Sequence, residues 1–564
     1  MDQNHPEKPG SIEPSDLLKD SQNKADRAKG MAGNKGNTSS GQQAGAEVFI
    51  GLVGAIGADL DSVASALADS LSEVNYTSSI IKISHLLHDF PKYRHLAKIT
   101  EEEVRYKEHM NAGTEVRKLF ECGEAMAQMA VTKIWRIRQE INSGRSASTS
   151  KLPIPRHAFI FSSLKHPSEV RFLRKLYGSS FFLLAAHTSR EKRIDILSRK
   201  ICKTHFKSDP HSFRAQAEAL IETDESEDGE KLGQNVRETY PDADYFIIGD
   251  SRNSIYAGVA RFVRLVFRHP FESPTVDELC MFHAKASAMR SADLSRQVGA
   301  VIAGKDGHLV ATGCNEVPKA GGGLYWPNDI SDHRDFQLGY DSNSRYKDET
   351  IVEILGRLRQ AGWLAPDKQN IDVDQLYDVA LNGGGRGILD GSRVTNVIEF
   401  GRIIHAEMAA ITQAARFGAS VSGTTLYCTT FPCHMCARHI IASGINRVVY
   451  IEPYPKSLAR ELYHDSIMVD PDEERSEYVN FVPFSGVAPR RFAHLFEKAK
   501  RKGSNGLAIT WEKHNAAPAV DWLIPPYTFA EDDVILMFAA KAFKKNLDAA
   551  PNDIGGLQDE ERTA

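Results

Sequence analysis

Two short segments in the second half of the chain combine residue types that can bind a metal ion: His405-Ala406-Glu407 and Pro432-Cys433-His434-Met435-Cys436. One imidazole and two thiolates fill three corners of a Zn²⁺ tetrahedron and leave the fourth corner for water. Because Cys433 and Cys436 are three residues apart, the first turn of a helix would place both sulfurs on one side. We therefore predict that His405, Cys433 and Cys436 are zinc ligands.

Glu407 is predicted to be the catalytic residue, because three other residues already suffice to bind the metal. Zinc lowers the pKa of a bound water to about 7, which supplies hydroxide at neutral pH. Glu407 would take the proton of this water, protonate a ring nitrogen of the substrate and later protonate the leaving ammonia. The order H-x-E and then P-C-x-x-C is the signature of zinc-dependent nucleobase deaminases.

Other interpretations of the same residues stay open at the level of sequence. Cys433 and Cys436 could form a redox pair, or part of a structural zinc site in which Cys428 or His434 is the fourth protein ligand. His405 could be an ordinary core histidine, and Glu407 a carboxylate that favours the start of a helix.

The elements expected around the two motifs alternate between helices and strands. Both motifs fall at the start of an expected helix, with one strand between them. A long polar and Gly-rich insertion, from about 317 to 397, separates them from the preceding strands. We expect helices at 276–289, 404–417 and 433–443, and strands at 298–302, 308–312, 425–428 and 447–451.

The first half of the chain predicts a parallel sheet covered on both faces. Apolar runs at 48–53, 157–161, 180–185 and 245–248 are typical of buried strands, and helical stretches lie between them. We divide the chain into a disordered arm (1–46), a first domain (47–268), a second domain with the zinc motifs (269–512) and a C-terminal extension (513–564). The arm is assigned from its lack of large apolar residues.

A glycine-rich turn with Gly51, Gly54 and Gly57 follows the first strand and is a candidate nucleotide loop. A working phosphate-binding loop has the pattern G-x-x-x-x-G-K-[ST]. Here Ala58 stands where the lysine is required and Asp59 where the hydroxyl is required, so phosphoryl transfer is not expected. Binding of a nucleotide or effector, or a structural role in assembly, remains open for this domain.

Two further stretches carry a resemblance to a family: Ser295 to Ile302 and Thr312-Gly313-Cys314-Asn315. Together with the zinc motifs they resemble the cytidine and deoxycytidylate deaminase superfamily, and within it the deoxycytidylate group. The resemblance implies that Asn315 contacts the sugar of a nucleotide. Arg296 is a candidate phosphate contact, and Ala406 is counted among the substrate-binding residues. Asn315 could instead be a turn residue, and Arg296 a solvent-facing arginine.

The whole layout is similar to bacterial antiphage deoxycytidylate/dCTP deaminases, which join a P-loop kinase-like domain to such a deaminase. The stretches Ile398 to Arg402, Glu452 to Ser457 and Val487 to Arg491 carry this resemblance. It implies an α/β protein with an N-terminal P-loop kinase-like parallel sheet flanked by helices, and a C-terminal cytidine-deaminase-like α/β/α domain. It also implies Zn²⁺ as cofactor and antiphage defence through depletion of dCTP.

Composition is that of a soluble protein: 564 residues, 41% hydrophobic, with a net charge of -5. Since no apolar run is long enough to span a bilayer, we expect a cytoplasmic protein without a membrane partner. The expected partners are free cytosine deoxynucleotides, a nucleotide or RNA regulator, and further copies of the chain. A tRNA-editing deaminase and a nucleotide sensor with a structural zinc are the alternatives.

Overall fold

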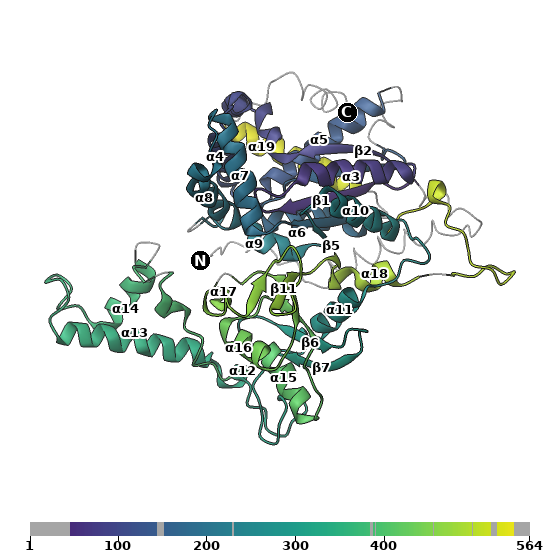
Figure 1. Cartoon of the computed structure of the whole chain (residues 1–564). Helices are drawn as coiled ribbons and strands as arrows, with labels where there is room; N and C mark the ends of the chain where they lie inside the picture. The colour runs from purple at the N-terminus through teal and green to yellow at the C-terminus, as the bar shows by residue number, and fades with distance from the viewer. Residues whose placement is uncertain are drawn as a thin grey trace, which may run out of the picture.

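The computed structural model describes residues 45–143, 152–227, 230–383, 387–389, 391–454, 456–498, 500–520 and 527–545. Two sheets of six strands each lie in two bodies, one above the other in Figure 1, and a helical arm projects from the lower body. The arm predicted to be disordered lies outside the described residues except for 45 and 46, and so does the tail beyond 545.

The first sheet has the strand order β12-β5-β4-β1-β3-β2. All neighbouring pairs among β1 to β5 are parallel, and only β12 is antiparallel to its neighbour β5. All seven residues of β1 are buried, as expected for an apolar strand covered on both faces. The strands are β1 (Val48–Gly54), β2 (Thr77–Lys82), β3 (His157–Ser162), β4 (Phe181–His187), β5 (Tyr245–Ile248) and β12 (Gly486–Val487).

The structure confirms the four strands expected in the first half of the chain and adds β2 as a fifth. β2 begins with the polar residues Thr77-Ser78-Ser79, which are partly exposed at the edge of the sheet. Because the apolar residues of β2 are confined to Ile80 and Ile81, the strand gives no long hydrophobic run in the sequence.

Helices cover both faces of the first sheet. α3 and α10 share one hydrophobic core with one face of the sheet. α4, α5, α6 and α19 share the core on the other face. The α-helices of this body are α3 (Leu60–Glu73), α4 (Glu102–Phe120), α5 (Ala125–Ile141), α6 (Pro167–Tyr177), α7 (Arg190–Thr204), α8 (Arg214–Glu225), α9 (Val236–Thr239), α10 (Arg252–Val266) and α19 (Tyr527–Lys544).

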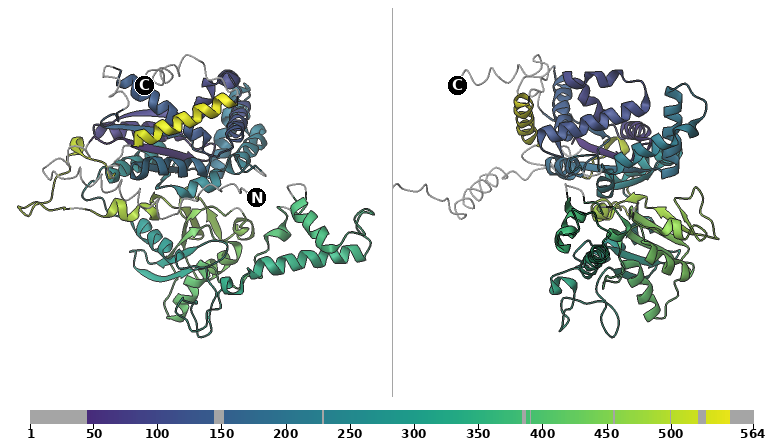
Figure 2. Two further views of the ribbon diagram at one scale, coloured as in Figure 1. Left: turned by 180° about the vertical axis from the view of Figure 1, so that it is seen from behind. Right: turned by 90° about the vertical axis from the view of Figure 1, so that its left-hand side faces the viewer.

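The last described helix, α19, returns to the first domain although it comes at the end of the chain. Seen from behind, it lies across the helices of that domain (Figure 2). The guanidinium of Arg138 on α5 donates to the carboxylates of both Glu47 and Glu531, and all three side chains are buried. Phe120 and Phe538 stack with ring centroids 4.6 Å apart. Helix α19, which lies within the expected C-terminal extension, is therefore part of the first domain's packing.

The second sheet has the strand order β10-β11-β9-β8-β6-β7. β8, β9, β11 and β10 are parallel, whereas β6 is antiparallel to both β7 and β8. α11 packs on one face, and α15 and α16 share the core on the other. The elements are α11 (Val276–Ala288), β6 (Gly299–Ala303), β7 (Leu309–Cys314), α15 (Ala406–Arg416), β8 (Thr425–Thr430), α16 (His434–Ala442), β9 (Arg447–Glu452), α17 (Ala459–Leu462), β10 (Ile467–Val469), β11 (Val479–Pro483) and α18 (Phe492–Phe496).

The expected helices and strands around the zinc motifs are confirmed to within a few residues. The sheet was expected to end at 451, but two further strands, β10 and β11, extend it. β10 has only three residues and β11 carries Asn480 and Pro483, so that neither produces a strong apolar signal.

The two bodies share hydrophobic core, although the sequence analysis placed a boundary near 269. Val487 of β12 pairs with Tyr245 of β5, and the ring centroids of Phe484 and Phe246 lie 5.7 Å apart. The backbone N–H of Val487 also donates to the buried carboxylate of Glu278 on α11, at 2.7 Å. A segment of the second domain thus completes the sheet of the first.

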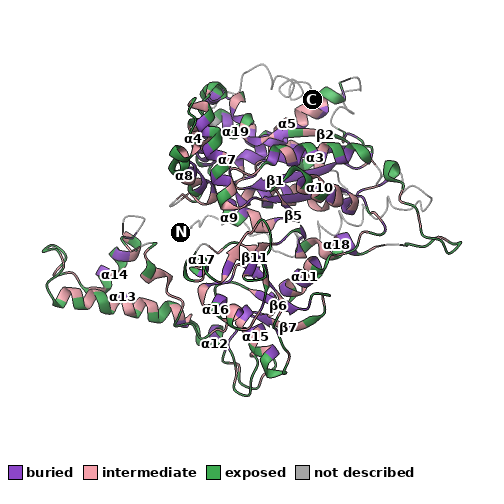
Figure 3. Ribbon diagram, viewed as in Figure 1, coloured by how far each residue is buried: buried purple, intermediate pink, exposed green. Residues whose placement is uncertain are grey.

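The insertion expected to be polar and Gly-rich contains α12 (Asp335–Leu338), α13 (Ser342–Gln360) and α14 (Val373–Asn382). These helices form the arm that projects from the second domain, and most of the surface of α13 is exposed or half-buried (Figure 3). Ion pairs one helical turn apart, Arg345 with Glu349 and Arg357 with Glu353, support α13 where tertiary packing is sparse. No helix in the described ranges has the length and apolarity needed to cross a membrane.

Candidate metal centre and catalytic residues

The three predicted metal ligands converge in space. Nδ1 of His405 lies 3.2 Å from Sγ of Cys433 and 3.4 Å from Sγ of Cys436. For zinc–nitrogen and zinc–sulfur bonds of about 2.0–2.3 Å, two corners of a tetrahedron lie about 3.6 Å apart. The donor set and its spacing therefore fit a zinc ion with three protein ligands.

Both ligand-bearing segments begin helices, and this local geometry aims the ligands at one point. His405 is the residue before α15, and Cys433 is the residue before α16. The Cys433 sulfur accepts a hydrogen bond from the backbone N–H of Cys436 in the first turn of α16. Together with the Cys436 thiol and the His405 ring, this environment lowers the pKa of Cys433 to about 4, which favours the thiolate that binds metals.

Glu407 lies in the first turn of α15 and is buried, with 4% of its surface exposed. Burial raises the pKa of this carboxyl, and the nearby Cys433 thiolate raises it further. A carboxyl group with a raised pKa next to a metal ion can both accept and return a proton near neutral pH. The structure therefore places Glu407 where the predicted proton shuttle is required.

The cluster leaves the fourth coordination position open within the described part of the chain. His405, Cys433 and Cys436 form a group whose ligand atoms all lie within 4.8 Å of one another, and neither Cys428 nor His434 belongs to it. The buried Cys428 thiol lies against the Glu407 carboxyl, and both burial and this carboxylate raise its pKa. A structural zinc site with four protein ligands is thus disfavoured.

Asn315, predicted to contact the nucleotide sugar, is 5% exposed and fully hydrogen-bonded within the protein. Its Oδ1 accepts from the N–H of Val298, and its Nδ2 donates to the carboxylate of Asp293 and to the carbonyl of Arg296. The pKa of the His405 ring is raised mainly by its hydrogen bond with Cys433. The negative charge of the Asp293 carboxylate raises it further. Asn315 therefore shapes the loop between Asp293 and Val298, close to the metal ligands.

Arg296 lies near the same centre but is half exposed. Its guanidinium lies over the ring of Tyr454 at 5.1 Å, and Nη1 is 3.9 Å from the Glu452 carboxylate. Tyr454 in turn is close enough to the Cys433 thiolate for that charge to contribute to raising its pKa, although burial is the main cause. Arg296 and Tyr454 thus lie side by side near the metal ligand Cys433.

Ala406 is fully buried, and its backbone carbonyl faces β7 rather than open space. A Cβ on Gly313 would lie 2.2 Å from this carbonyl oxygen and 2.5 Å from the backbone nitrogen of Ala410. Only glycine permits so close an approach of β7 to α15. Gly313 therefore sets the position of the helix that presents His405 and Glu407.

Only two of the three glycines predicted to form the candidate nucleotide loop line a cavity in the first domain. Gly54 and Gly57 line a cavity of about 240 Å³ at the carboxyl end of β1. Gly51 instead lies inside β1 and is buried, and a Cβ there would come within 2.6 Å of the Leu164 side chain. Gly51 is thus a packing residue of the sheet.

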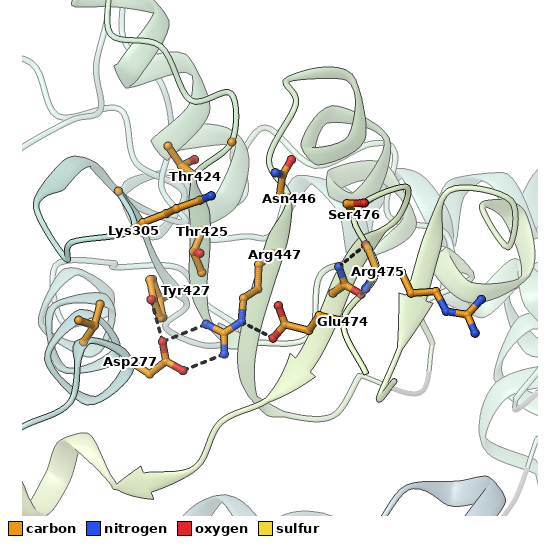
Figure 4. A pocket seen from close by; sticks show the side chains of 14 residues that line it. Asp277, Lys305, Thr424, Thr425, Tyr427, Asn446, Arg447, Glu474, Arg475 and Ser476 are labelled. Atoms are coloured by element: carbon orange, nitrogen blue, oxygen red, sulfur yellow. Dashed lines mark hydrogen bonds and ion pairs between the residues drawn. The ribbon is translucent and has the colours of Figure 1, made fainter. Parts of the chain in front are cut away.

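Another pocket, of about 400 Å³, opens at the amino ends of β8 and β9, whereas the metal ligands lie beyond the carboxyl end of β8. Arg447 makes a bidentate ion pair with Asp277 there and a third contact with Glu474, and Asp277 also accepts from Tyr427 (Figure 4). These three charges pair with one another, whereas Lys305 and Arg475 also line the pocket.

Sequence reasoning missed Asp293 as part of the metal-centre environment. It stands in the turn after α11 and carries no motif, and its contact with Asn315, at 2.7 Å, together with its charge effect on His405 links it to the site. The resemblance that selected Asn315 could have pointed to a polar partner for its amide, since a buried amide is normally hydrogen-bonded.

Comparison with known proteins places these residues in a shared region. Residues 274–452 match the family described as the cytidine and deoxycytidylate deaminase zinc-binding region. The chain is 52% identical over 167 residues to the deoxycytidylate deaminase of Enterobacteria phage T4, which covers 29% of this chain and 70% of the phage protein. It is 31% identical over 163 residues to the mouse deoxycytidylate deaminase, covering 28% of this chain and 78% of the mouse protein.

Among solved structures, a dCMP deaminase of cyanophage S-TIM5 in complex with dCMP and dUMP is similar at 18% identity. The likeness covers 38% of this chain and all of that chain, with a TM-score of 0.21, which is too low to add to the fold assignment.

Proposed function

The chain belongs to the deoxycytidylate deaminase family, and from this premise we propose that it hydrolyses the 4-amino group of a free deoxycytidine nucleotide: dCMP, dCTP or both. Water adds to the ring carbon that bears the amine, ammonia leaves, and the deoxyuridine nucleotide is the product. The observation that carries the proposal is the convergence of His405, Cys433 and Cys436 beside the buried carboxyl of Glu407.

Each of these residues has one task in the proposed reaction. His405, Cys433 and Cys436 would hold Zn²⁺, which activates a water molecule for attack by lowering its pKa to about 7. Glu407 would take a proton from the attacking water and deliver it to the ring nitrogen next to the reacting carbon. It would then take the second proton, from the hydroxyl group now on that carbon, and pass it to the departing amine. The burial that raises the pKa of Glu407 makes its carboxylate a stronger base for the water proton.

The surrounding side chains offer contacts for the rest of the nucleotide. We propose that Arg296 contacts the phosphate, since its guanidinium is half exposed beside the metal ligands and makes only a long ion pair with Glu452. Asn315 would meet the sugar only if one of its present hydrogen bonds is exchanged, so its part in shaping the loop at Asp293 supports a positioning role. Ala406 would act through its backbone N–H, because its side chain is buried and its carbonyl faces β7.

The experiment that tests the function is ammonia release by the purified, zinc-loaded full chain. The substrates are dCMP, dCTP, deoxycytidine and a tRNA anticodon stem. We expect deamination of at least one of the two nucleotides and none of the tRNA stem. Release from the tRNA stem alone would replace the proposal by nucleic-acid editing, and no release with zinc bound would favour a sensor.

We also propose that deamination serves antiphage defence in the cytoplasm by depleting dCTP. This role rests on the similarity of the whole layout to antiphage deaminases. It is tested by measuring dCTP in infected cells that carry either the wild-type chain or the Glu407→Gln variant. Equal dCTP pools, with equal phage yields, would refute it.

For the first domain we propose a P-loop kinase-like fold that binds a nucleotide without phosphoryl transfer. The parallel strand order β5-β4-β1-β3-β2, with a glycine loop after the central strand β1, supports the fold. Ala58 and Asp59 in place of lysine and hydroxyl argue against kinase activity. Assembly into homo-oligomers, and an RNA regulator, are further proposals that light scattering and co-purification of nucleic acid would test.

A further inference from the structure

The cavity of the first domain has an anion-binding group that the glycine loop does not supply. The cavity measures about 240 Å³ and opens at the carboxyl ends of β1, β2 and β3, between the loop after β1 and helix α4. Ligands of open parallel sheets bind at this edge. The polar groups at this edge that have no partner within the protein determine which ligand can bind.

Two backbone donors, one in the loop and one in the first turn of α3, are already taken by carboxylates. The N–H of Ile56 donates to Oδ2 of Asp224 at 2.7 Å, and the N–H of Ser62 donates to Oδ1 of Asp59 at 3.0 Å. In a phosphate-binding loop these backbone groups face phosphate oxygens. Because carboxylates occupy these two groups, fewer backbone donors remain for the phosphates of a nucleoside triphosphate.

Lys165, in the segment after β3, brings an ammonium group to the start of the loop that lacks its own lysine. Its Nζ donates to the carbonyl oxygen of Gly54 at 3.0 Å and lies 2.8 Å from Oδ1 of Asp224. Its side chain is 18% exposed and lines the cavity. The charges of Lys165 and of the buried Asp224 carboxylate thus neutralise each other beside the loop.

Arg117 on α4 is the group that remains unsatisfied. Its side chain is 3% exposed, and Nη2 donates to Oε1 of Glu169 at 3.0 Å. Nε and Nη1 have no hydrogen-bond partner among the described residues, although Arg117 lines the cavity. Buried guanidinium donors without partners are costly, and the planar fork of arginine fits the oxygens of a phosphate. Arg117 therefore indicates an oxyanion site.

The remainder of the cavity suits a flat organic ring. The aromatic Tyr106, the amide of Gln234 and the apolar Met110 and Leu87 line it together with the charged groups. The volume is below the roughly 300–1,000 Å³ of drug-sized ligand sites, which favours one small ligand over a triphosphate or a polynucleotide.

We propose that this cavity binds a nucleoside 5'-monophosphate, with its phosphate at Arg117 and its base among Tyr106, Gln234 and Met110. The proposal deepens the nucleotide-binding role proposed above for the first domain, and it does not depend on the deaminase reaction. It differs from binding at the glycine loop, because the phosphate contact comes from helix α4.

Gly113 provides a test variant that leaves the Arg117–Glu169 ion pair in place. It lies one turn before Arg117 on α4 and lines the cavity, and a Cβ there would be 3.8 Å from Nε2 of Gln234 and 3.9 Å from Nη1 of Arg117. A Gly113→Leu side chain would thus start without a clash and fill the cavity. Replacing a helical glycine also does not weaken the helix.

The experiment is equilibrium dialysis of the full chain against dGMP, dTMP, ATP and inorganic phosphate. The proteins are the wild type, Arg117→Gln, Gly113→Leu and the control Arg199→Gln, whose arginine is 69% exposed and pairs with Asp195. We expect one or both monophosphates to bind the wild type and the control, and affinity to fall at least tenfold in the other two variants. Melting temperatures show which variants are folded.

Several results would overturn the proposal. These are monophosphate binding that survives Gly113→Leu, tighter binding of ATP than of either monophosphate, binding of inorganic phosphate with equal affinity, and no binding at all. A Cys433→Ser variant separates this failure from failure of the deaminase: it should keep monophosphate binding in the first domain while losing ammonia release.

Discussion

Sγ of Cys433 lies 3.2 Å from Nδ1 of His405, although 28 residues separate them in the chain. The contact exists because α15 and α16 pack side by side on one core face of the second sheet. His405 and Cys433 each stand directly before the first residue of one of these helices. Two helix starts, rather than one contiguous loop, thus build the metal centre.

Replacing one sulfur ligand should release the metal. In Cys433→Ser, the hydroxyl is a much poorer zinc ligand than a thiolate, so we expect bound zinc, measured by elemental analysis, to fall from about one ion per chain to a small fraction of that. Cys314→Ser is the control, because Cys314 is buried but lies outside the cluster. Full zinc content in Cys433→Ser would contradict the ligand assignment.

Removing the charge of Glu407 should abolish turnover while the metal stays bound. We expect kcat of Glu407→Gln to fall by at least about 10²–10⁴-fold, the usual contribution of a general acid–base group, with an unchanged zinc content. The matched control is Glu399→Gln on the exposed segment before His405. Retention of more than about a tenth of the wild-type kcat would show that Glu407 is not the general acid–base group.

The close approach of β7 to α15 should make Gly313 intolerant of any side chain. Gly313→Ala would place a methyl 2.2 Å from the carbonyl oxygen of Ala406, and overpacking of this kind costs about 1–3 kcal/mol. Denaturant unfolding measures the loss, and ammonia release should fall as α15 shifts. Gly356→Ala on exposed α13, where a Cβ meets nothing within 4 Å, should instead be neutral or stabilising.

Asp470 should make the contact between the two bodies sensitive to acid. Burial raises its pKa, but His187 at the end of β4 and Tyr450 on β9 outweigh this effect and hold the pKa below its usual value. A lowered folded-state pKa means that the carboxylate contributes stability above the unfolded-state value of about 3.9, and that this contribution is lost as pH falls through the folded-state pKa.

The comparison of wild type with Asp470→Asn measures this contribution. We expect the variant to lose about 1–3 kcal/mol of unfolding free energy at pH 7, and this difference to shrink as pH falls below the unfolded-state value of about 3.9 and through the lower folded-state pKa. The control Asp472→Asn changes an exposed residue paired with Lys192 and should have little effect. A difference that does not change with pH would show that the charge of Asp470 is not responsible.

The metal centre could be predicted from the sequence because its ligands lie in two short motifs at helix starts. The strands of both sheets were equally visible wherever an apolar run was long, as in β1 and β4. β12 escaped prediction because two residues, Gly486 and Val487, form a strand only by pairing with β5. No local pattern contains that information.

Arg117 was invisible for a related reason. On its own helix it is an ordinary charged residue, and its burial depends on Glu169 fifty-two positions later. Likewise, Asp224 occupies the N–H of Ile56 from 168 residues away. The sequence showed that the glycine loop lacks its lysine, but only the fold shows which charged groups lie next to the loop.

The place of β12 in the first sheet has a consequence for how the protein is made and how it is cut. During synthesis, the outer edge of β5 stays uncovered until the chain has been extended through the entire second domain, and an uncovered edge is a site of unwanted pairing with other chains. A fragment that stops near 268 would carry that bare edge permanently and would also lack α19. The two halves of the chain are therefore joined by shared architecture, and the first half alone would lack both β12 and α19.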